Sequence, residues 1–472
     1  MPIPAPRISR KRTRAIYLLL VCLLVAMLMG CGRKPTTPQL LLLITVDTLR
    51  ADRLGAYGSD LGLTPNLDAL AEDSVVFTAA YAAAPFTLPS VSALMTGRHP
   101  EALGIFRNES VFPASVPTLA SELNRYGWKT RAVVSNFILR HESGIASGFE
   151  TFDDEFPQVE IVRKWPERVA PDTTEAALAL LDDCVPDEDS HCFLWVHYQD
   201  PHGPYTPPEA LHAAELAREE GRSDSERLLP VSDDHTGIGA IPNYQIIDDR
   251  RDVGFYRAGY HAEIRYLDGE IGRLLEAIEE RGLGRRTLIA FTADHGEGLG
   301  ENDYWFAHGE YLNDSQLHVP LMFRVAGRAP ERRNDVASLT DVFHTLLAAS
   351  IDFPLEPEPA GRDLLAANAE QTPSRAYSAS LGGSHQQRHG LIDGEYRLVI
   401  TQRDGIGDAR LTNRSNDIDL SAAAPQIAKP MRNRLNRIRA RLARGLEETL
   451  QDLSDEERKS LEALGYVGET EP

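Results

Sequence analysis

The chain has 472 residues, with 49 Lys and Arg against 70 Asp and Glu, and its formal net charge is −21 at pH 7. Such a surface repels phosphate backbones and anionic lipid head groups, which argues against nucleic-acid binding and against electrostatic docking to a membrane. The length is sufficient for one large α/β domain with a smaller appendage.

The N-terminal segment has the organisation of an export signal. Basic residues precede an apolar run over Ala15–Met29, and Leu28-Met29-Gly30-Cys31 resembles a bacterial lipobox, whose cysteine is acylated. A single-span signal anchor is the alternative, although the run is short for a transmembrane helix. We therefore expect a lipoprotein signal peptide over residues 1–30, lipidation of Cys31 and a tether over residues 31–39.

Cysteine usage agrees with export. Only Cys184 and Cys192 follow Cys31, and their short separation brackets a polar loop. An oxidising compartment would permit a disulfide between them, while two free thiols are the alternative. We expect a lipid-anchored bacterial membrane protein that faces the periplasm or the cell exterior.

Five continuous apolar runs follow the tether. They cover Leu40–Val46, Arg131–Val134, Cys192–Tyr198, Thr287–Ala293 and Val319–Val325. Runs of this kind are typical of strands that are buried on both faces, and helical periods lie between them. The sequence therefore predicts an α/β catalytic domain over residues 40–353, with a mostly parallel sheet flanked by helices.

Two of the expected helices have readable signals. Thr64-Pro65 places a cap before an early proline, and the segment Tyr260–Arg281 carries one stripe of isoleucine and leucine. The segment 214–251 is polar, acidic and without period. We expect it to be a long surface excursion over the site, or a mobile loop.

The proline-rich run over residues 354–359 marks the end of the large domain. A smaller C-terminal α+β subdomain is expected over residues 354–430, with a strand at Tyr396–Thr401. A charged helical tail is expected over residues 431–472.

Acidic residues and histidines follow three of the predicted strands. They are Asp47, then Asp200 with His202, and Asp294 with His295. Ligands of open parallel sheets collect outside the carboxyl ends of the strands. One acid after a strand is more often a surface residue, but three together favour a metal site.

The segment 84–97 adds a hydroxyl to this group. Pro89 fits an early helical position and Gly97 a terminal one, which places Thr87 in the N-cap region of a short helix. The free N–H groups and the positive dipole end favour a bound anion. A cation-bound Thr87 hydroxyl could attack phosphorus or sulfur, while the alternative is that Thr87 only caps the helix.

Several motifs, in this order along the chain, resemble the sulfatase branch of the alkaline phosphatase superfamily. They are Val46–Gly58 with Thr64–Leu67, Thr87–Ser90 with Thr96-Gly97, Asp200–Tyr205, Asp294–Glu297 with His308-Gly309 and Val319–Leu321, and Leu461–Val467. The resemblance implies an alkaline-phosphatase-like fold and a metal-dependent enzyme that cleaves esters.

The chain departs from the sulfatase pattern at four places. A sulfatase carries a cysteine or serine that is oxidised to formylglycine, and the branched Thr87 cannot give that aldehyde. Val91 stands where the family has an arginine, and Thr48 where it has a second aspartate. The stretch Gly127–Ile138 lacks the lysine and histidine that hold sulfate. These departures argue against the formylglycine route.

A threonine nucleophile together with an Asp-His pair resembles the phosphoethanolamine and phosphoglycerol transferases. That resemblance implies histidines that contact the transferred group, His202 and His308, and a metal bound by Asp47, Thr87, Asp294 and His295. An imidazole ligand favours zinc or manganese, with calcium and magnesium as alternatives. The polar stretch with His385, Arg388 and His389 is expected to be an exposed loop, with closure of the pocket as the alternative.

Together these patterns predict a metal-dependent hydrolase of phosphate or sulfate esters with Thr87 as nucleophile. A phosphoethanolamine- or phosphoglycerol-type transferase is one alternative. A degenerate domain that only binds is another. A lipid anchor in place of the transmembrane helices of those transferases favours hydrolysis.

Overall fold

The computed structural model describes residues 37–445 except 161, 163, 186, 188, 233–235, 352–360, 367–373, 382–385, 404–405 and 415–416, together with residues 447 and 449. The predicted signal peptide, the lipidation site Cys31, His385 and the motif Leu461–Val467 lie outside the described residues. Within the described part of the chain, no helix has the length and apolar composition needed to cross a bilayer.

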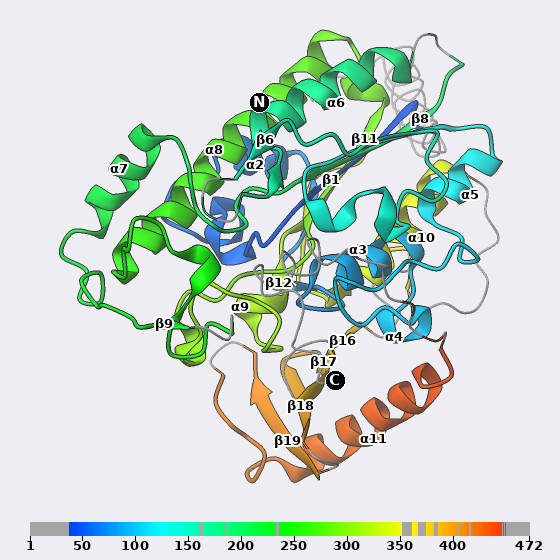
Figure 1. Ribbon diagram of the computed structural model, residues 1–472. Helices are drawn as coiled ribbons and strands as arrows, with labels where there is room; N and C mark the ends of the chain where they lie inside the picture. Colours follow the sequence, from blue (N-terminus) through cyan, green and yellow to red (C-terminus); the bar gives the residue numbers. More distant parts are fainter. Residues whose placement is uncertain are drawn as a thin grey trace, which may run out of the picture. The chain divides into compact units, whose positions relative to one another are not determined.

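An eight-stranded sheet forms the centre of the large domain (Figure 1). Its order is β14 (Glu331–Arg333), β2 (Val75–Phe77), β13 (Leu321–Arg324), β11 (Thr287–Ala293), β1 (Leu40–Val46), β8 (Cys192–Tyr198), β4 (Lys129–Val134) and β5 (Thr151–Asp153). The strands from β11 to β5 are mutually parallel, whereas β13 runs antiparallel to β11. The mostly parallel sheet expected from the apolar runs is therefore confirmed.

The three central strands, β1, β8 and β11, are paired in register over their full length. In β1, Leu40 pairs with Cys192 and Thr287, and Val46 pairs with Tyr198 and Ala293. Every residue of these strands is buried, which explains their continuous apolar sequences. All three strands therefore end at the same level, and the residues that follow them lie along one edge of the sheet.

Helices cover both faces of the sheet (Figure 1). One group comprises α2 (Pro65–Glu72), α6 (Ala170–Cys184), α7 (Glu209–Glu219) and α8 (Val253–Glu280), which pack on one another. The other comprises α3 (Thr87–Thr96), α5 (Leu119–Arg125) and α10 (Thr340–Ser350). The stripe predicted over Tyr260–Arg281 belongs to α8, which begins earlier than expected.

The excursion expected over residues 214–251 is only partly irregular, because α7 extends into it as far as Glu219. Glu215 and Glu219 of α7 are buried and form ion pairs with Arg265 and Arg257 of α8. Ion pairs rather than an apolar stripe hold this helix against its neighbour. The apolar periodicity that would have revealed the helix is therefore absent from its sequence.

The smaller elements connect the layers. They are α4 (Pro100–Leu103), α9 (Asp314–Leu317), the sheet of β12 (His318–Val319), β3 (Ala80–Tyr81) and β15 (Ala337–Ser338), and the pairs β6 (Gln158–Val159) with β7 (Pro166–Glu167) and β9 (Val231–Ser232) with β10 (Ile241–Pro242).

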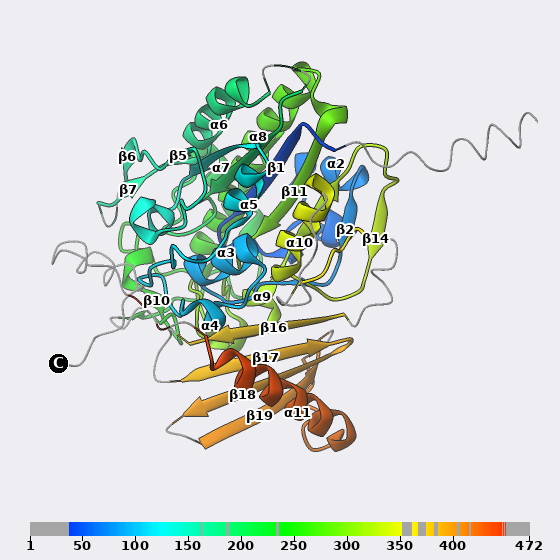
Figure 2. The same cartoon turned by 90° about the vertical axis from the view of Figure 1, so that its right-hand side faces the viewer.

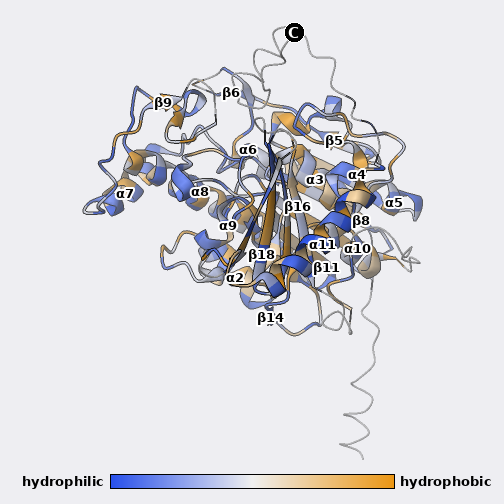
Figure 3. Ribbon diagram, turned by 90° about the horizontal axis from the view of Figure 1, so that it is seen from below, coloured by the Kyte–Doolittle hydropathy of each residue, from blue (hydrophilic) through white to orange (hydrophobic). Residues whose placement is uncertain are grey.

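An antiparallel sheet with one helix forms the C-terminal subdomain (Figure 2). Its strands are β16 (Arg375–Ser380), β17 (Gln387–Asp393), β18 (Tyr396–Arg403) and β19 (Ile406–Asn413), and the helix is α11 (Pro425–Leu442). The helix predicted from residue 431 begins instead at Pro425. Met431 and Leu435 of α11 are buried against the sheet, so this helix is part of the subdomain and not of a separate tail. The rest of α11 is mainly hydrophilic, as Figure 3 shows.

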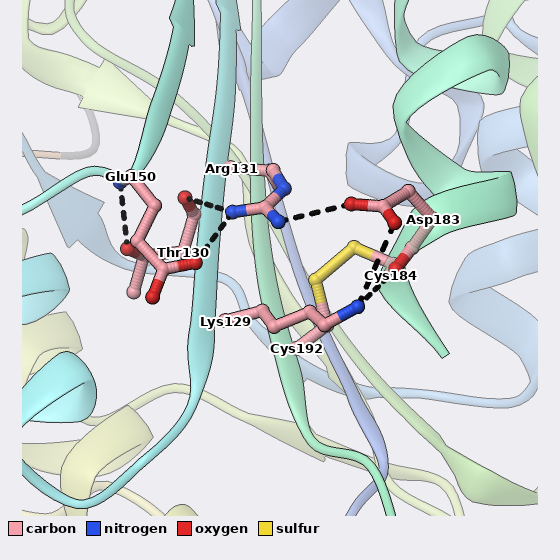
Figure 4. The surroundings of a disulfide bond; sticks show 7 residues. All are labelled: Lys129, Thr130, Arg131, Glu150, Asp183, Cys184 and Cys192. Carbon is pink, nitrogen blue, oxygen red and sulfur yellow. Dashed lines mark hydrogen bonds and ion pairs between the residues drawn. A yellow bond between two sulfur atoms is a disulfide. The ribbon is translucent and has the colours of Figure 1, made fainter. Parts of the chain in front are cut away.

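Cys184 at the end of α6 and Cys192 at the start of β8 form a disulfide bond, with Cα atoms 5.3 Å apart (Figure 4). Beside it, Arg131 of β4 donates hydrogen bonds to Asp183 at 2.9 Å and to Glu150 at 2.7 Å. The disulfide joins the end of the outer helix α6 to the start of the central strand β8, and it closes the loop between them.

Candidate active site

Three of the four predicted metal ligands form one buried group after β1 and β11. Asp47, Asp294 and His295 each offer one ligand atom, and these atoms all lie within 4.8 Å of one another. His295 Nε2 is 3.7 Å from Asp47 Oδ1 and 3.7 Å from Asp294 Oδ2. The fourth predicted ligand, Thr87, lies beside them, with Oγ1 3.5 Å from His295 Nε2.

Each carboxylate has one oxygen held by the protein and one without a partner. Asp294 Oδ1 accepts hydrogen bonds from the amides of Thr48 at 3.2 Å and His295 at 2.7 Å. Asp47 Oδ2 accepts a hydrogen bond from Asn136 Nδ2. The remaining oxygens, Asp47 Oδ1 and Asp294 Oδ2, are buried and form no hydrogen bond with the described residues. They are the two oxygens that lie near His295 Nε2.

This arrangement fits a divalent cation. Ligands about 2.1 Å from a tetrahedral ion are roughly 3.4 Å from one another, close to the separations found here. Burial raises the pKa of Asp47 well above its ordinary value, and the charge of Asp294 raises it further. Burial also raises the pKa of Asp294 to about 8 and lowers that of His295 to about 4. A cation at the shared position would favour ionised carboxylates beside a neutral imidazole, which is the form that binds metals.

Thr87 is the first residue of α3 and does not cap it. The N-cap is Phe86, and no side chain caps the helix. Ser90 Oγ donates a 2.6 Å hydrogen bond to the carbonyl of Asp294, which fixes this end of α3 against the residues that follow β11. The alternative that Thr87 serves only as a helix cap therefore loses its structural basis.

The amides at the start of α3 are less free than the sequence suggested. The amide of Leu88 donates a 3.0 Å hydrogen bond to Asn108 Oδ1. Asn108 is 1% exposed, and its Nδ2 has no partner among the described residues. Asn108 thus supplies an unused donor next to the residue that follows Thr87.

The two predicted catalytic histidines lie at the same site. The ring centroid of His308 is 4.5 Å from that of His295 and 5.2 Å from that of His202. His308 Nδ1 lies 3.5 Å from Glu297 Oε1, and Tyr205 donates a 3.3 Å hydrogen bond to Glu297 Oε2. Burial raises the pKa of Glu297 and lowers that of His308. A neutral His308 can present an N–H donor to an oxyanion.

Asp200, which the strand ends placed with the other acids, is not in the metal group. It forms a carboxyl pair with Glu263 of α8, and Glu263 Oε1 accepts a 2.8 Å hydrogen bond from the amide of Thr206. Burial raises the pKa of Asp200 to about 6. The pair fixes the segment that carries His202, so its role is structural support.

The exposed loop expected around Arg388 and His389 is instead part of β17, where both side chains are buried. Arg388 donates a 3.0 Å hydrogen bond to Glu310, two residues after His308. The prediction was wrong because residues of the large domain provide partners for both side chains. Glu310 accepts the hydrogen bond from Arg388, and Glu101 lies beside His389.

Sequence reasoning missed three supporting residues: Asn136, Glu297 and Asn108. Asn136 is near the end of β4 and could have been found by the rule that identified Asp47. The roles of Glu297 and Asn108 depend on contacts between distant segments, which no local pattern encodes.

The family model described as Sulfatase matches residues 39–351. Iduronate 2-sulfatase of Homo sapiens is 31% identical over 382 residues, covering 69% of this chain and 66% of that protein. Choline-sulfatase of Rhizobium meliloti (strain 1021) is 27% identical over 356 residues, covering 65% of this chain and 66% of that protein. The chain thus spans slightly less than two thirds of the length of these relatives.

Solved structures agree on the fold. A protein solved in complex with its substrate D-glucosamine-2-N,6-O-disulfate has a TM-score of 0.68 and 18% identity, covering 86% of this chain and 98% of its own. The phosphonate monoester hydrolase of Silicibacter pomeroyi has a TM-score of 0.65 and 19% identity, covering 85% and 95%.

Proposed function

The chain belongs to the sulfatase family, and from that membership we propose that it is a metal-dependent hydrolase that cleaves phosphate or sulfate esters with Thr87 as nucleophile. One observation carries the proposal. The hydroxyl of Thr87 lies 3.5 Å from His295 Nε2, beside two buried carboxylate oxygens that have no hydrogen-bond partner among the described residues.

The chemical type of the ligand atoms favours one class of cation. Asp47, Asp294, His295 and Thr87 would hold it, and one imidazole among oxygen ligands favours zinc or manganese over calcium or magnesium. When bound, a cation of this kind polarises the ester and lowers the pKa of a coordinated hydroxyl.

In the proposed reaction Thr87 is the nucleophile, and the two histidines contact the oxygens of the ester. Thr87 Oγ1 forms a bond to phosphorus or sulfur while the bond to the ester oxygen breaks, and the alcohol leaves with a proton. His308 stabilises the non-bridging oxygens or protonates the leaving oxygen, and His202 acts through Nε2 in its protonated form, because its Nδ1–H donates a 2.7 Å hydrogen bond to the carbonyl of Gly203. Water then attacks the esterified Thr87, releases the inorganic anion and restores the hydroxyl.

The names of the relatives support esters of sulfur and of phosphorus. Iduronate 2-sulfatase and choline-sulfatase are named for sulfate esters, and the structural neighbour from Silicibacter pomeroyi is named for phosphonate monoesters. Thr87 in place of a formylglycine precursor is compatible with direct attack on either element. Rates on an aryl phosphate, an aryl phosphodiester, an aryl phosphonate and an aryl sulfate would rank the classes.

Thr87→Val tests the nucleophile, because valine keeps the shape and loses the hydroxyl. Turnover should fall by about 10⁴-fold or more, as expected when a covalent nucleophile is removed. Thr96→Val is the matched control, since Thr96 Oγ1 bonds to the carbonyl of Ser92 within the same helix. Retained activity in Thr87→Val with full metal content would refute the proposal. A transferase would instead give a new ester when glycerol is added.

We also propose that the enzyme works from a lipid anchor on Cys31, facing the periplasm or the cell exterior. The export-like leader supports this location, and the bridge between Cys184 and Cys192 suits an oxidising compartment. Cys31→Ala should abolish palmitate labelling and release the protein from the membrane fraction. Unchanged membrane association would contradict the lipid anchor.

A further inference from the structure

The two histidines of the site belong to separate segments, and one residue of the excursion over residues 214–251 contacts both segments. His202 lies in the segment that follows β8, and His308 lies in the segment that follows β11. The contacting residue is Gln245, the last residue of the 3₁₀ turn η5 (Asn243–Gln245). Gln245 is fully buried, although the excursion is polar in sequence.

The first contact supports the backbone that leads to His308. Gln245 Nε2 donates a 3.0 Å hydrogen bond to the carbonyl of Phe306. The φ angle of Phe306 is 48°, in the left-handed region that bulky side chains rarely adopt. Such a conformation persists only where the surrounding structure holds it. The hydrogen bond from Gln245 is part of that support, and it therefore helps to set the position of His308, two residues later.

The second contact is with the residue that follows His202. The Gln245 amide lies directly against Gly203, because a Cβ atom added at Gly203 would be 2.1 Å from both Oε1 and Nε2 of Gln245. Only glycine leaves room for the amide at this position. The carbonyl of Gly203 accepts the 2.7 Å hydrogen bond from His202 Nδ1. One amide group is thus packed on the residue that orients His202 and is bonded to the segment that carries His308.

The Gln245 side chain is held in this place at a cost in stability. Its Oε1 is buried and forms no hydrogen bond with the described residues. A buried acceptor without a partner is unfavourable, and an apolar side chain of similar size would avoid that penalty. Packing alone therefore does not explain a glutamine here, whereas the need to fix two segments relative to each other does.

We propose that Gln245 is a positioning residue that sets the spacing between His202 and His308, whose ring centroids are 5.2 Å apart. The inference rests on the proposed function, because both histidines act there on the oxygens of the ester. Gln245 acts through the two histidines. The end of the excursion therefore belongs to the support of the active site and is not only a cover over it.

Gln245→Met tests this role, because methionine keeps the length of the side chain and loses both polar atoms. The variant loses the hydrogen bond to Phe306 and the unpaired acceptor together, so its Tm and metal content should match those of the parent. Its kcat for an aryl phosphate should fall about tenfold or more, and its Kd for orthovanadate should rise about tenfold, measured by calorimetry on the metal-loaded full chain. Gln402→Met is the matched control. It loses the hydrogen bond from Arg439 in the C-terminal subdomain and should change neither value.

Two combined variants distinguish positioning from a general structural effect. Gly203→Ala displaces the Gln245 amide and should weaken orthovanadate binding as Gln245→Met does, but it should have no effect in a Gln245→Ala chain, where the space is open. In a chain that carries His202→Ala and His308→Ala, adding Gln245→Met should leave the orthovanadate affinity unchanged. A general structural effect would give the same loss with and without the two imidazoles.

Equal losses of orthovanadate affinity with and without the two imidazoles would overturn the inference, as would an unchanged affinity in Gln245→Met. If the parent hydrolyses no ester but the orthovanadate results hold, the proposed function fails and the role of Gln245 stands. If the parent hydrolyses esters and Gln245→Met does so at the same rate, the proposed function stands and the role of Gln245 fails.

Discussion

Asp294→Asn should stabilise the metal-free protein, and this advantage should shrink when a metal is bound. Asparagine keeps an oxygen for the amides of Thr48 and His295, which now bind Asp294 Oδ1, and replaces only the unpaired Oδ2. The substitution therefore removes one charge and one ligand atom while retaining the local backbone contacts. Its consequence depends on whether a cation is present to balance that charge.

The magnitude follows from the pKa of Asp294, which burial raises from 3.8 to about 8. A carboxyl with a raised pKa in the folded state contributes stability below its unfolded pKa and loses it as pH rises towards the folded pKa. At pH 7 the metal-free protein loses about 4 kcal/mol in this way, to order of magnitude. For roughly 400 ordered residues the unfolding entropy is about 0.8 kcal/mol per degree, so the variant should melt about 5 °C higher in chelator.

With metal the difference between the variant and the parent narrows. A cation at 100 times its Kd stabilises the parent protein by about 2.7 kcal/mol, or roughly 3 °C, and should leave the variant's Tm unchanged. Differential scanning calorimetry at pH 7, with EDTA and then with added Zn²⁺ or Mn²⁺, measures both shifts. Asp341→Asn is the control, because Asp341 is equally buried but bonds to the amides of Ser338 and Arg362. An equal metal-induced shift in Asp294→Asn and the parent would refute the reasoning, as would a lower Tm of the variant in chelator.

Three other outcomes are expected. Replacing Cys184 and Cys192 together with Ala should lower the free energy of unfolding by about 2.5 kcal/mol, the loop-closure value for so short a loop, in a denaturant titration without reductant. Asp200→Asn should stabilise the protein at pH 8 and not at pH 4. The pKa of Asp200, raised to about 6, makes the parent lose stability between these limits, and chemical unfolding at both pH values would show it. Equal effects at both would contradict the assigned carboxyl pair with Glu263. Asn136→Ala should weaken metal binding about tenfold by freeing a ligand carboxylate, measurable by competition with a chromogenic chelator; an unchanged Kd would argue against this support.

The sequence predicts the central strands and the acids that follow them well, because both are encoded by short contiguous segments. Strands buried on both faces have continuous apolar runs, and Asp47 and Asp294 each follow such a run directly. The register that brings them together could be inferred only in general terms, from the rule that ligands gather at the carboxyl ends of parallel strands.

What the sequence does not reveal depends on pairing between distant segments. Asp47 directly follows β1, whereas Asp200 stands two residues after the end of β8 and pairs with Glu263 of α8 outside the metal group. Arg388 and His389 form a polar pattern that is typical of a loop, but partners in the large domain allow both to be buried in a strand. From sequence alone a polar residue is predicted to be exposed, because the distant ion-pair or hydrogen-bond partner that allows its burial is not apparent.

The matched register of β1, β8 and β11 separates two kinds of change. The acids and the imidazole stand on the rigid end of the sheet, whereas the attacking hydroxyl stands on α3, a separate helix held by the Ser90 hydrogen bond to the Asp294 carbonyl. The nucleophile can therefore be exchanged without shifting a single strand. One scaffold can in this way accommodate different reactive side chains over time, because the helix that carries the nucleophile and the strand ends that carry the acids meet at only a few contacts.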